Sequence, residues 1–362
     1  MTHDPLLLSP AEVAASGAAI AAVQEPDGAV PWTVGGHTDT WNHVEAAMAL
    51  LVAGELEAVG RAWAWVRRTQ RSDGSWPLKV VSGEVADASG ETNMAAYVAV
   101  GVWHHWLVRR DLGFVTAHWP VVRRALDLVC AMQLPFGGIS WSQEWHHGEP
   151  ATVNREALLA GSSSIHQALR AGLTLADLLD DPQPEWELTA GRLGHALREH
   201  RDRFLDKSEY SMDWYYPVLG GAVRGAAGRA LLAERWDEFV EPGLGVRCIV
   251  TNPWVTGAET CELALALDAL GDRDRALTAF GDAQHLRQPD GSYLTGYVYP
   301  DEVHWPGEHT TFTTAAALVA HDALAGTTAG AGVFRGTGLV SDPEPLGLEC
   351  GCESADLVAG RA

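Results

Sequence analysis

Residues 259–293 read ETCELALALDALGDRDRALTAFGDAQHLRQPDGSY, and this stretch decides the fold. An Ala/Leu-rich segment opens at Glu259 and stops at Gly271, as a helix does when glycine forms its C-cap. A second helical segment runs to Gln288, where the sequence PDG supplies the positive φ of a tight turn. The stretch therefore predicts one unit of helix, turn, helix and turn.

The same unit occurs near the start of the chain, where residues 39–76 read DTWNHVEAAMALLVAGELEAVGRAWAWVRRTQRSDGSW. From Glu45 to Gln70 is 25 residues, and from Glu262 to Gln288 is 26. This near-equal spacing indicates that the two stretches are copies of one repeat. A third turn of the same kind, QLPFGGISW, ends at residue 141.

Other segments complete a set of about six helix pairs. A capped helix is expected to begin near Ser9 and Pro10, and signals for strands are nearly absent. We therefore predict an all-α fold, an (α/α)6 toroid in one domain over residues 1–327. Residues 328–362 are expected to form an irregular tail that either follows the surface or is disordered. Inner helices are expected to begin near residues 39, 90, 162, 214, 259 and 309, with outer helices around 55–69, 118–132, 187–205, 228–238 and 273–286.

The amino-acid composition makes some classes of binding partner improbable. The 362 residues include 47 acidic and 25 basic side chains, a net charge of −22, which disfavours nucleic acid and anionic membrane surfaces. No apolar run is long enough to span a membrane, and the N-terminus lacks a charged signal-peptide start, so a cytoplasmic protein is expected. Cys130, Cys248 and Cys261 read as reduced buried thiols, and the pair Cys350 and Cys352 is only a weak metal motif.

Carboxylates near the starts of the predicted inner helices should surround one cavity, because these helices all point their N-termini to one end of the toroid. N-capping explains Glu91 and Glu259 as well as any function does. Glu262 differs, since it lies one turn inside an apolar helix, where burial raises a carboxyl pKa toward that of a general acid. Asp39 should stay ionised at a helix start, as a general base must.

Such a pair of carboxylates suits glycoside hydrolysis, with a separation of about 6.5–9.5 Å if the anomeric configuration is inverted. We predict Glu262 as the acid and Asp39 as the base, with Glu259 as the alternative acid. Glu45, the repeat counterpart of Glu262, is expected to pair with an Arg or His. No metal and no cofactor are expected.

The chain holds 15 tryptophans but only seven Phe and seven Tyr. Flat aromatic faces serve as platforms for sugar rings, and most of these residues lie in turns or at helix starts, which places them at the mouth of the cavity. The predicted substrate-binding residues are Trp32, Trp41, His43, Trp76, Glu91, Trp141, Asp213, Trp214, Tyr215, Trp254 and Glu259.

The turns QRSDGSW and QPDGSY resemble the QW-type repeats of squalene–hopene cyclases and protein prenyltransferases, which implies the fold but not the activity. Three stretches also resemble a group of actinobacterial toroid proteins often labelled prenyltransferase-like, whose mycobacterial members include an endo-acting, cytoplasmic α-mannosidase of methylmannose polysaccharide. This resemblance implies an endo-glycosidase acting on an α-(1→4)-linked mannan. The stretches are MDWYYPVLGGAVRGAAGRAL (212–231), NPWVTGAETCELALALDALG (252–271) and WPGEHTTFTTAAALVA (305–320).

Two other functions stay open at this point. A terpene cyclase or prenyltransferase acting on an isoprenoid diphosphate would need Mg²⁺ or Zn²⁺, and Glu259, Cys261 and His309 mimic the zinc ligands of the prenyltransferases. The cavity is expected to be acidic, which suits a diphosphate poorly. A toroid that binds glycans without cleaving them is the third possibility, and the oligomeric state is left open.

Overall fold

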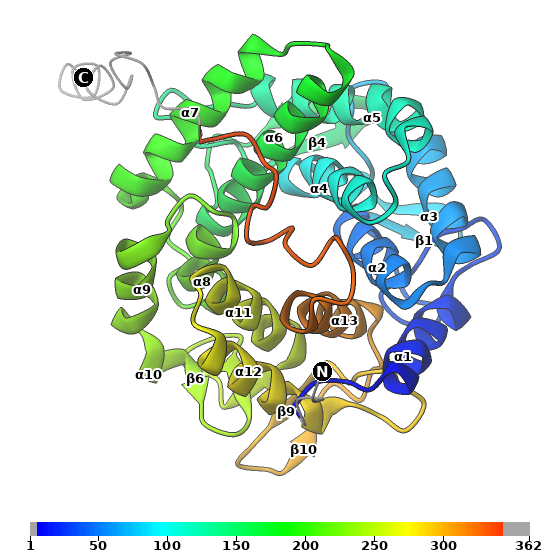
Figure 1. Cartoon of the computed structure of the whole chain (residues 1–362). Helices are drawn as coiled ribbons and strands as arrows, with labels where there is room; N and C mark the ends of the chain where they lie inside the picture. The colour runs from blue at the N-terminus through cyan, green and yellow to red at the C-terminus, as the bar shows by residue number, and fades with distance from the viewer. Residues whose placement is uncertain (1–5, 343–362) are drawn as a thin grey trace.

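The computed structural model describes residues 6–342, and Cys350 and Cys352 lie outside this range. Its helices form two concentric layers around a common axis (Figure 1). Inner and outer helices alternate along the chain, as the repeat predicts. The inner helices are α2 (Thr40–Ala53), α4 (Thr92–Arg109), α6 (Leu159–Leu179), α8 (Ser211–Leu219), α11 (Gly257–Ala269) and α13 (Thr311–Ala325), and the outer ones are α1 (Pro10–Val23), α3 (Leu56–Thr69), α5 (Leu112–Ala131), α7 (Pro184–Glu199), α9 (Gly225–Glu234) and α12 (Arg273–Asp282).

The inner layer closes on itself. Each inner helix packs against the next in chain order, and α13 packs against α2 to complete the ring. Helix α1 contacts both α2 and α13 and so covers the closing joint from outside. It begins as expected, because Ser9 and Glu12 form a reciprocal capping box behind Pro10. The all-α toroid is therefore confirmed.

Loops at the N-terminal ends of the inner helices carry short antiparallel strands that the sequence did not predict. Strand β3 leads directly into α4 and β8 into α11, so these sheets fix where two inner helices begin. The sheets are β1 (Lys79–Val81) with β2 (Glu84–Asp87); β3 (Gly90–Glu91), β4 (Ser142–His146) and β5 (Glu149–Val153); and β10 (Val303–His304), β9 (Gly296–Val298), β8 (Trp254–Thr256), β7 (Gly245–Arg247) and β6 (Val240–Glu241), in spatial order. Three short helical segments, η1 (Arg201–Arg203), α10 (Trp236–Phe239) and η2 (Ala283–Leu286), complete the described elements.

The repeated glutamines hold neighbouring repeats together. The Gln70 side-chain amide donates to the carbonyl of Gly74 in its own turn and to that of Val121 in the next outer helix, at 3.1 and 2.9 Å. Gln133 makes the same pair of bonds to its own turn and to α7, and Gln24 makes them to its own turn and to α3. The conspicuous glutamine of the repeat is therefore a clamp between outer helices.

Helix α8 is shorter than the sequence suggests. It ends at Leu219, because Gly221 adopts a positive φ of 85° and Gly220 lies against the backbone of α6. A Cβ on Gly220 would come within 2.0 Å of the Ser163 carbonyl oxygen. The Gly-Gly pair thus lets α6 and α8 approach closely.

The described part of the expected tail, residues 328–342, contains no helix or strand, and it alternates between buried and exposed residues. It crosses the C-terminal end of the inner ring (Figure 1), where Val333 and Phe334 are buried. We call residues 328–342 the C-terminal strap. Gln167 and Arg224 donate to the carbonyl oxygens of Val333 and Phe334, at 3.2 and 2.7 Å. The strap therefore runs along the C-terminal end of the ring, with its adjacent apolar residues Val333 and Phe334 packed into the lumen.

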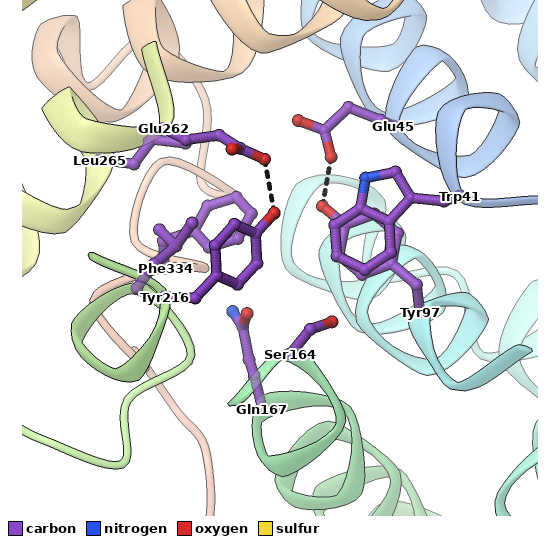
Figure 2. A pocket seen from close by; sticks show the side chains of 10 residues that line it. Trp41, Glu45, Tyr97, Ser164, Gln167, Tyr216, Glu262, Leu265 and Phe334 are labelled. Carbon is purple, nitrogen blue, oxygen red and sulfur yellow. Dashed lines mark hydrogen bonds between the residues drawn. The ribbon is translucent and has the colours of Figure 1, made fainter. Parts of the chain in front are cut away.

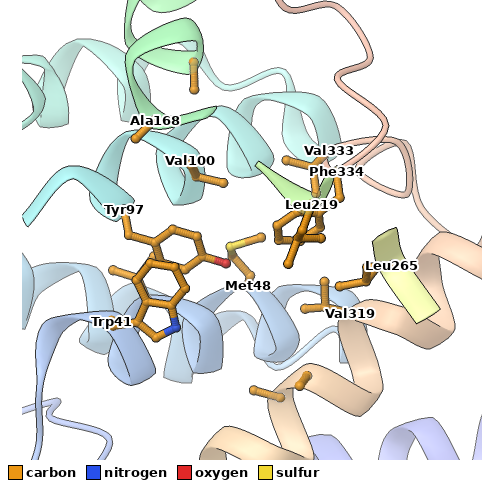
Figure 3. Close-up of a cluster of buried hydrophobic side chains, with 14 of the residues drawn as sticks. Trp41, Met48, Tyr97, Val100, Ala168, Leu219, Leu265, Val319, Val333 and Phe334 are labelled. Atoms are coloured by element: carbon orange, nitrogen blue, oxygen red, sulfur yellow. The ribbon is translucent and has the colours of Figure 1, made fainter. Parts of the chain in front are cut away.

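The lumen of the ring is built in layers, because positions spaced by four and three residues share one face of a helix. The polar layer comprises the residues six positions after each inner N-cap, and below it lies an apolar layer nine positions after the N-cap. Figure 3 shows several side chains of this apolar layer packed with Val333 and Phe334 of the strap. The polar layer is Glu45, Tyr97, Ser164, Tyr216, Glu262 and Ala316, and the apolar layer is Met48, Val100, Gln167, Leu219, Leu265 and Val319.

Within the described residues, no helix is both long and apolar enough to cross a membrane.

Candidate active site

An open pocket of about 270 Å³ lies at the N-terminal end of the inner ring. It is formed largely by side chains from the first turns of the inner helices, one or two from each of five helices. We call it the entrance pocket, and its lining includes Trp41, Asn42, Asn93, Met94, Ala160, Met212 and Phe312. Trp41, Ser164 and Tyr216 form its floor, since they also line a second cavity below.

The second cavity, which we call the inner cavity, has a volume of about 10 Å³, room for about one water molecule. The carboxylates of Glu45 and Glu262 enter it from α2 and α11 (Figure 2). The Tyr216 hydroxyl donates to Glu262 Oε1 at 2.6 Å, and the Tyr215 hydroxyl donates to Oε2. The Tyr97 hydroxyl donates to Glu45 Oε2.

Burial changes the acidity of both carboxyl groups. It raises the pKa of Glu262 to about 8, and the nearby charge of Glu45 adds to this effect. It raises the pKa of Glu45 to about 7, against the opposing effect of the Tyr97 hydrogen bond. Within the described residues, no Lys, Arg or His lines the inner cavity to stabilise a second negative charge. Burial and the absence of a nearby cation therefore favour the protonated form of Glu262.

Ser164 contributes an unsatisfied polar group to the same space. Its Oγ atom is buried and has no hydrogen-bond partner within the described part of the chain. A buried hydroxyl without a partner is costly, so it marks a position where water or a ligand hydroxyl would bind. Ser164 lies between the entrance pocket and the inner cavity.

Asp39 and Glu91 form a second acidic pair at the first turns of α2 and α4. Asp39 is the N-cap of α2, and its Oδ1 accepts from the backbone N–H of Asn42 at 2.9 Å. Its Oδ2 accepts from the Asn42 side chain and lies 3.5 Å from His37 Nε2. Glu91 is the N-cap residue of α4, but its side chain makes no capping bond. Burial first, and then the charge of Asp39, raise the pKa of Glu91 to about 7.

These contacts reverse the sequence-based assignment of capping. Asp39, expected to be free for catalysis, is the residue that caps its helix, whereas Glu91 is not occupied in this way. Glu259 lies in the first turn of α11, whose N-cap is Thr256 without a side-chain capping bond. Its side chain instead contacts the Cys248 thiol, and the charges of Glu259 and Glu262 help to raise the pKa of that thiol above its ordinary value.

Trp41 and Tyr215 lie at the cavities, as the sequence predicts for a binding site. The Trp41 ring stacks on Tyr97 with the two ring centroids 3.9 Å apart, and it lines both cavities. Tyr215 is fully buried, so it reaches the site through its hydrogen bond to Glu262 and offers no open platform. Trp32 is half-buried and stacks on His37, which places it near Asp39.

His43, Trp76 and Trp214 do not reach the lumen, so their prediction as substrate-binding residues is corrected. His43 and Trp214 each lie four residues after an N-cap, about 200° around the helix from the polar layer. Both are buried against the outer layer, where the Trp214 Nε1–H donates to the Leu231 carbonyl at 3.1 Å. His43 Nδ1 accepts from the backbone N–H of Val30 at 3.0 Å.

Trp76 is also directed toward the outer layer, since its Nε1–H donates to the Val66 carbonyl of α3 at 3.1 Å. Asp213 lines a separate groove and accepts from the backbone N–H of Ala160 at 3.1 Å, and burial raises its pKa to about 6. Trp141 and Trp254 do not line either cavity. Trp254 packs edge-on against the exposed Trp305 on the β8–β9–β10 side of the toroid.

Sequence reasoning missed several residues that the structure brings to the cavities. Glu45 was expected to pair with a cation, but its partner is the Tyr97 hydroxyl. Tyr97 and Ser164 were not singled out, and Tyr216 was expected only as an aromatic side chain at the cavity mouth. The signal that finds them is their constant distance of six residues from the N-caps of their helices, which requires knowledge of where each helix starts.

The zinc-like set of the prenyltransferases is not assembled. Among the described residues, no group of three or more His, Cys, Asp and Glu side chains is close enough to hold a metal ion. His309 instead lies with Nδ1 2.6 Å from the Ser292 hydroxyl. Cys261 is fully buried, and burial raises the pKa of its thiol far above the ordinary value.

Comparison with known structures agrees with the fold. A glycosidase of known structure superimposes with a TM-score of 0.69 at 17% identity, over 87% of this chain and 98% of the other. A D-mannose isomerase superimposes with a TM-score of 0.66 at 11% identity, over 86% and 96% of the two chains. The class is therefore that of the α/α toroids.

A relative found by sequence identifies the family as well as the fold. The MMP endo-(1,4)-3-O-methyl-alpha-D-mannosidase of Mycolicibacterium hassiacum is 52% identical over 356 residues, which cover 97% of this chain and 96% of that protein. No family model matches the sequence. The chain belongs to the family of this mannosidase, which confirms the resemblance to the mannosidase-containing toroid group.

Proposed function

We propose that this protein is an endo-acting glycoside hydrolase that cleaves (1→4) bonds between 3-O-methyl-α-D-mannose units of a polysaccharide. The observation that carries the proposal is the 52% identity with the mannosidase over nearly the full length of both chains. The lumen supports it, because its carboxyl groups include acids with raised pKa values and its mouth carries an aromatic face. The terpene cyclase and prenyltransferase alternative is not favoured.

Glu262 would donate its proton to the glycosidic oxygen as the bond to the anomeric carbon breaks. Asp39 would take a proton from the water that forms the new bond to that carbon, so that one water is consumed in each turnover. The support for Glu262 is its buried carboxyl, because burial and the charge of Glu45 raise its pKa to about 8 against the opposing effect of two tyrosine hydroxyls. Side chains on a helix lean toward its N-terminus, which directs Glu262 toward the entrance pocket.

The support for Asp39 is weaker, because both of its oxygens are engaged by Asn42. It lies about 9 Å nearer the mouth than the polar layer, given a rise of about 1.5 Å per residue over six residues. Glu91, next to Asp39, is the alternative for either role.

The activity is tested by incubating the protein with purified 3-O-methylmannose polysaccharide and sizing the products. Shortened oligosaccharides of defined length are expected, with an unmethylated α-(1→4)-glucan as the matched control. Intact polysaccharide after prolonged incubation would refute the proposed activity. Product anomers followed by NMR would separate inversion from retention.

The roles are tested with Glu262→Gln, Asp39→Asn and Glu91→Gln in parallel. Glu262→Gln is expected to lower kcat by about 10²–10⁴-fold, which is the contribution of a general acid to the rate. Polysaccharide binding should be retained, since the binding groups stay in place. Turnover close to wild type in Glu262→Gln would remove this residue from the mechanism. A larger loss in Glu91→Gln than in Asp39→Asn would assign the base role to Glu91.

We further infer a cytoplasmic location. The three described cysteines are free thiols, as is usual in reducing compartments. The polysaccharide is the only partner proposed.

A further inference from the structure

Glu45 has no part in the mechanism above, yet it occupies a position equivalent to that of Glu262. Each lies six residues after the N-cap of its inner helix, and each carboxylate enters the inner cavity and accepts from a tyrosine hydroxyl (Figure 2). Both side chains are almost completely buried. A charged carboxylate placed there needs a partner, and only neutral hydroxyl groups are supplied.

The groups that face Glu262 come from every neighbouring part of the lumen. Helix α2 contributes Glu45, while α4 and α8 contribute only tyrosines of raised pKa. Helix α6 contributes the uncharged Ser164 and Gln167, and α13 places an alanine at this level. On its own side of the ring, Glu262 is near Glu259, Cys261 and Cys248. All of these charges are negative or absent, so Glu45 is the closest counterpart of Glu262 across the cavity.

We propose that Glu45 is a positioning residue that keeps Glu262 in its protonated, proton-donating form. Two carboxylates that share a cavity with room for one water cannot both ionise at neutral pH, so the charge on one retains the proton on the other. The Tyr97 hydroxyl stabilises the ionised form of Glu45. The Tyr215 and Tyr216 hydroxyls act in the same way on Glu262, but burial and the charge of Glu45 outweigh them and raise its pKa to about 8. This inference rests on the proposed function and on Glu262 as its general acid.

The test compares Glu45→Gln with Glu45→Asp by the pH dependence of kcat/KM on the polysaccharide. Glu45→Gln removes the charge at nearly constant volume, so the alkaline limb is expected about one pH unit lower than in wild type. Glu45→Asp keeps the charge and should restore the wild-type limb. A Glu45→Gln enzyme whose limb stays at the wild-type pH would show that Glu45 only fills space, and a Glu45→Asp limb displaced as far as that of Glu45→Gln would equally overturn the proposal.

A second variant and a second readout guard against loss of folding or of activity. Tyr97→Phe removes the hydroxyl that stabilises the Glu45 charge, so its alkaline limb should also move to lower pH. Infrared titration of the protonated carboxyl band follows the Glu262 proton without substrate, with Glu262→Gln to assign the band. An unchanged midpoint in both Glu45→Gln and Tyr97→Phe would overturn the proposal. Wild-type protein that leaves the polysaccharide intact would instead refute the proposed function.

Discussion

At the scale of single residues, three buried glutamates make the protein sensitive to pH. The pKa values of Glu45, Glu91 and Glu262 are raised from 4.5 to about 7, 7 and 8 by burial. The folded state therefore holds protons that the unfolded state releases. Their contribution to stability is complete below about pH 4.5 and is lost as the pH rises through 7 to 8.

We therefore predict that the Tm of the wild-type protein falls between pH 5 and pH 9. Glu262→Gln cannot release this proton, so its Tm should fall less over the same range. Differential scanning calorimetry across the range measures both slopes. Parallel slopes for the two proteins would mean that Glu262 titrates alike when folded and unfolded.

Trp41 is the aromatic side chain best placed to contact a sugar, since it lines both cavities and stacks on Tyr97. Trp41→Ala is expected to lower kcat/KM for the polysaccharide by about tenfold or more, because an aromatic contact contributes about 0.5–1.5 kcal/mol beyond the area that it buries. Trp214→Ala is the matched control: it should lower the Tm and leave KM unchanged. Equal kcat/KM in wild type and Trp41→Ala would exclude Trp41 as a platform.

The sequence predicted Glu262 as a buried acid, because a carboxylate with apolar neighbours on both sides within a helix is expected to be buried, and burial raises its pKa. It could not separate Trp41 from Trp214, because both lie in the first turn or so of an inner helix. Two residues of spacing decide which one faces the lumen, and helix starts are not known to that accuracy from the pattern alone.

At the scale of elements, the tight turns of the repeat fix the distance between outer helices. Gly74 has a φ of 97°, and a Cβ there would lie 2.1 Å from the Arg124 carbonyl oxygen of α5. Gly83 has a similar φ of 80° but faces open space. Substitutions at the two positions therefore distinguish the energetic cost of backbone strain from the cost of disturbing close packing.

Gly74→Ala is expected to destabilise the protein more than Gly83→Ala. Gly83→Ala carries only the cost of a left-handed backbone, about 1–2 kcal/mol, while Gly74→Ala must also move α5 away from the turn. Urea unfolding of the two variants measures the difference. Equal losses would mean that the turn can shift without cost.

The elements show why the helices were predictable and the strands were not. Ala/Leu-rich helices that end in glycine mark several of the hairpins, as at Gly54 and Gly326, and Ser9 with Glu12 marks the first cap. The strands have two to five residues and lie in loops, too short for an alternating pattern to appear. Their effect on the site is nonetheless direct, since β3 and β8 lead into the helices that carry Tyr97 and Glu262.

At the scale of the whole molecule, the C-terminal strap completes the ring. Phe334 lines the inner cavity from the C-terminal side, and Asp342 anchors the strap through Arg198 at 2.8 Å and His166 at 2.7 Å. Composition concealed this role, because Gly- and Thr-rich segments are usually read as surface chain. The indications in the sequence were two apolar pairs, Val333 with Phe334 and Leu339 with Val340.

Phe334→Ala should destabilise the protein by about 3–5 kcal/mol, the usual cost of removing a buried phenylalanine. It should also admit water beneath the polar layer, which lowers the pKa of Glu262 and moves the alkaline limb of activity to lower pH. Phe334→Leu, which keeps most of the volume, is the control. Thermal unfolding and a pH profile measure the two effects, and an unchanged limb in a folded Phe334→Ala protein would show that the cavity stays dry.

The strap also determines how a polysaccharide substrate can enter and leave the ring. Because the strap closes the C-terminal end of the ring, the site has one opening, and a long glycan cannot pass through the ring from one end to the other. Both halves of a cut chain must back out through the opening by which they entered, which favours release after each cut over continuous sliding along the polymer.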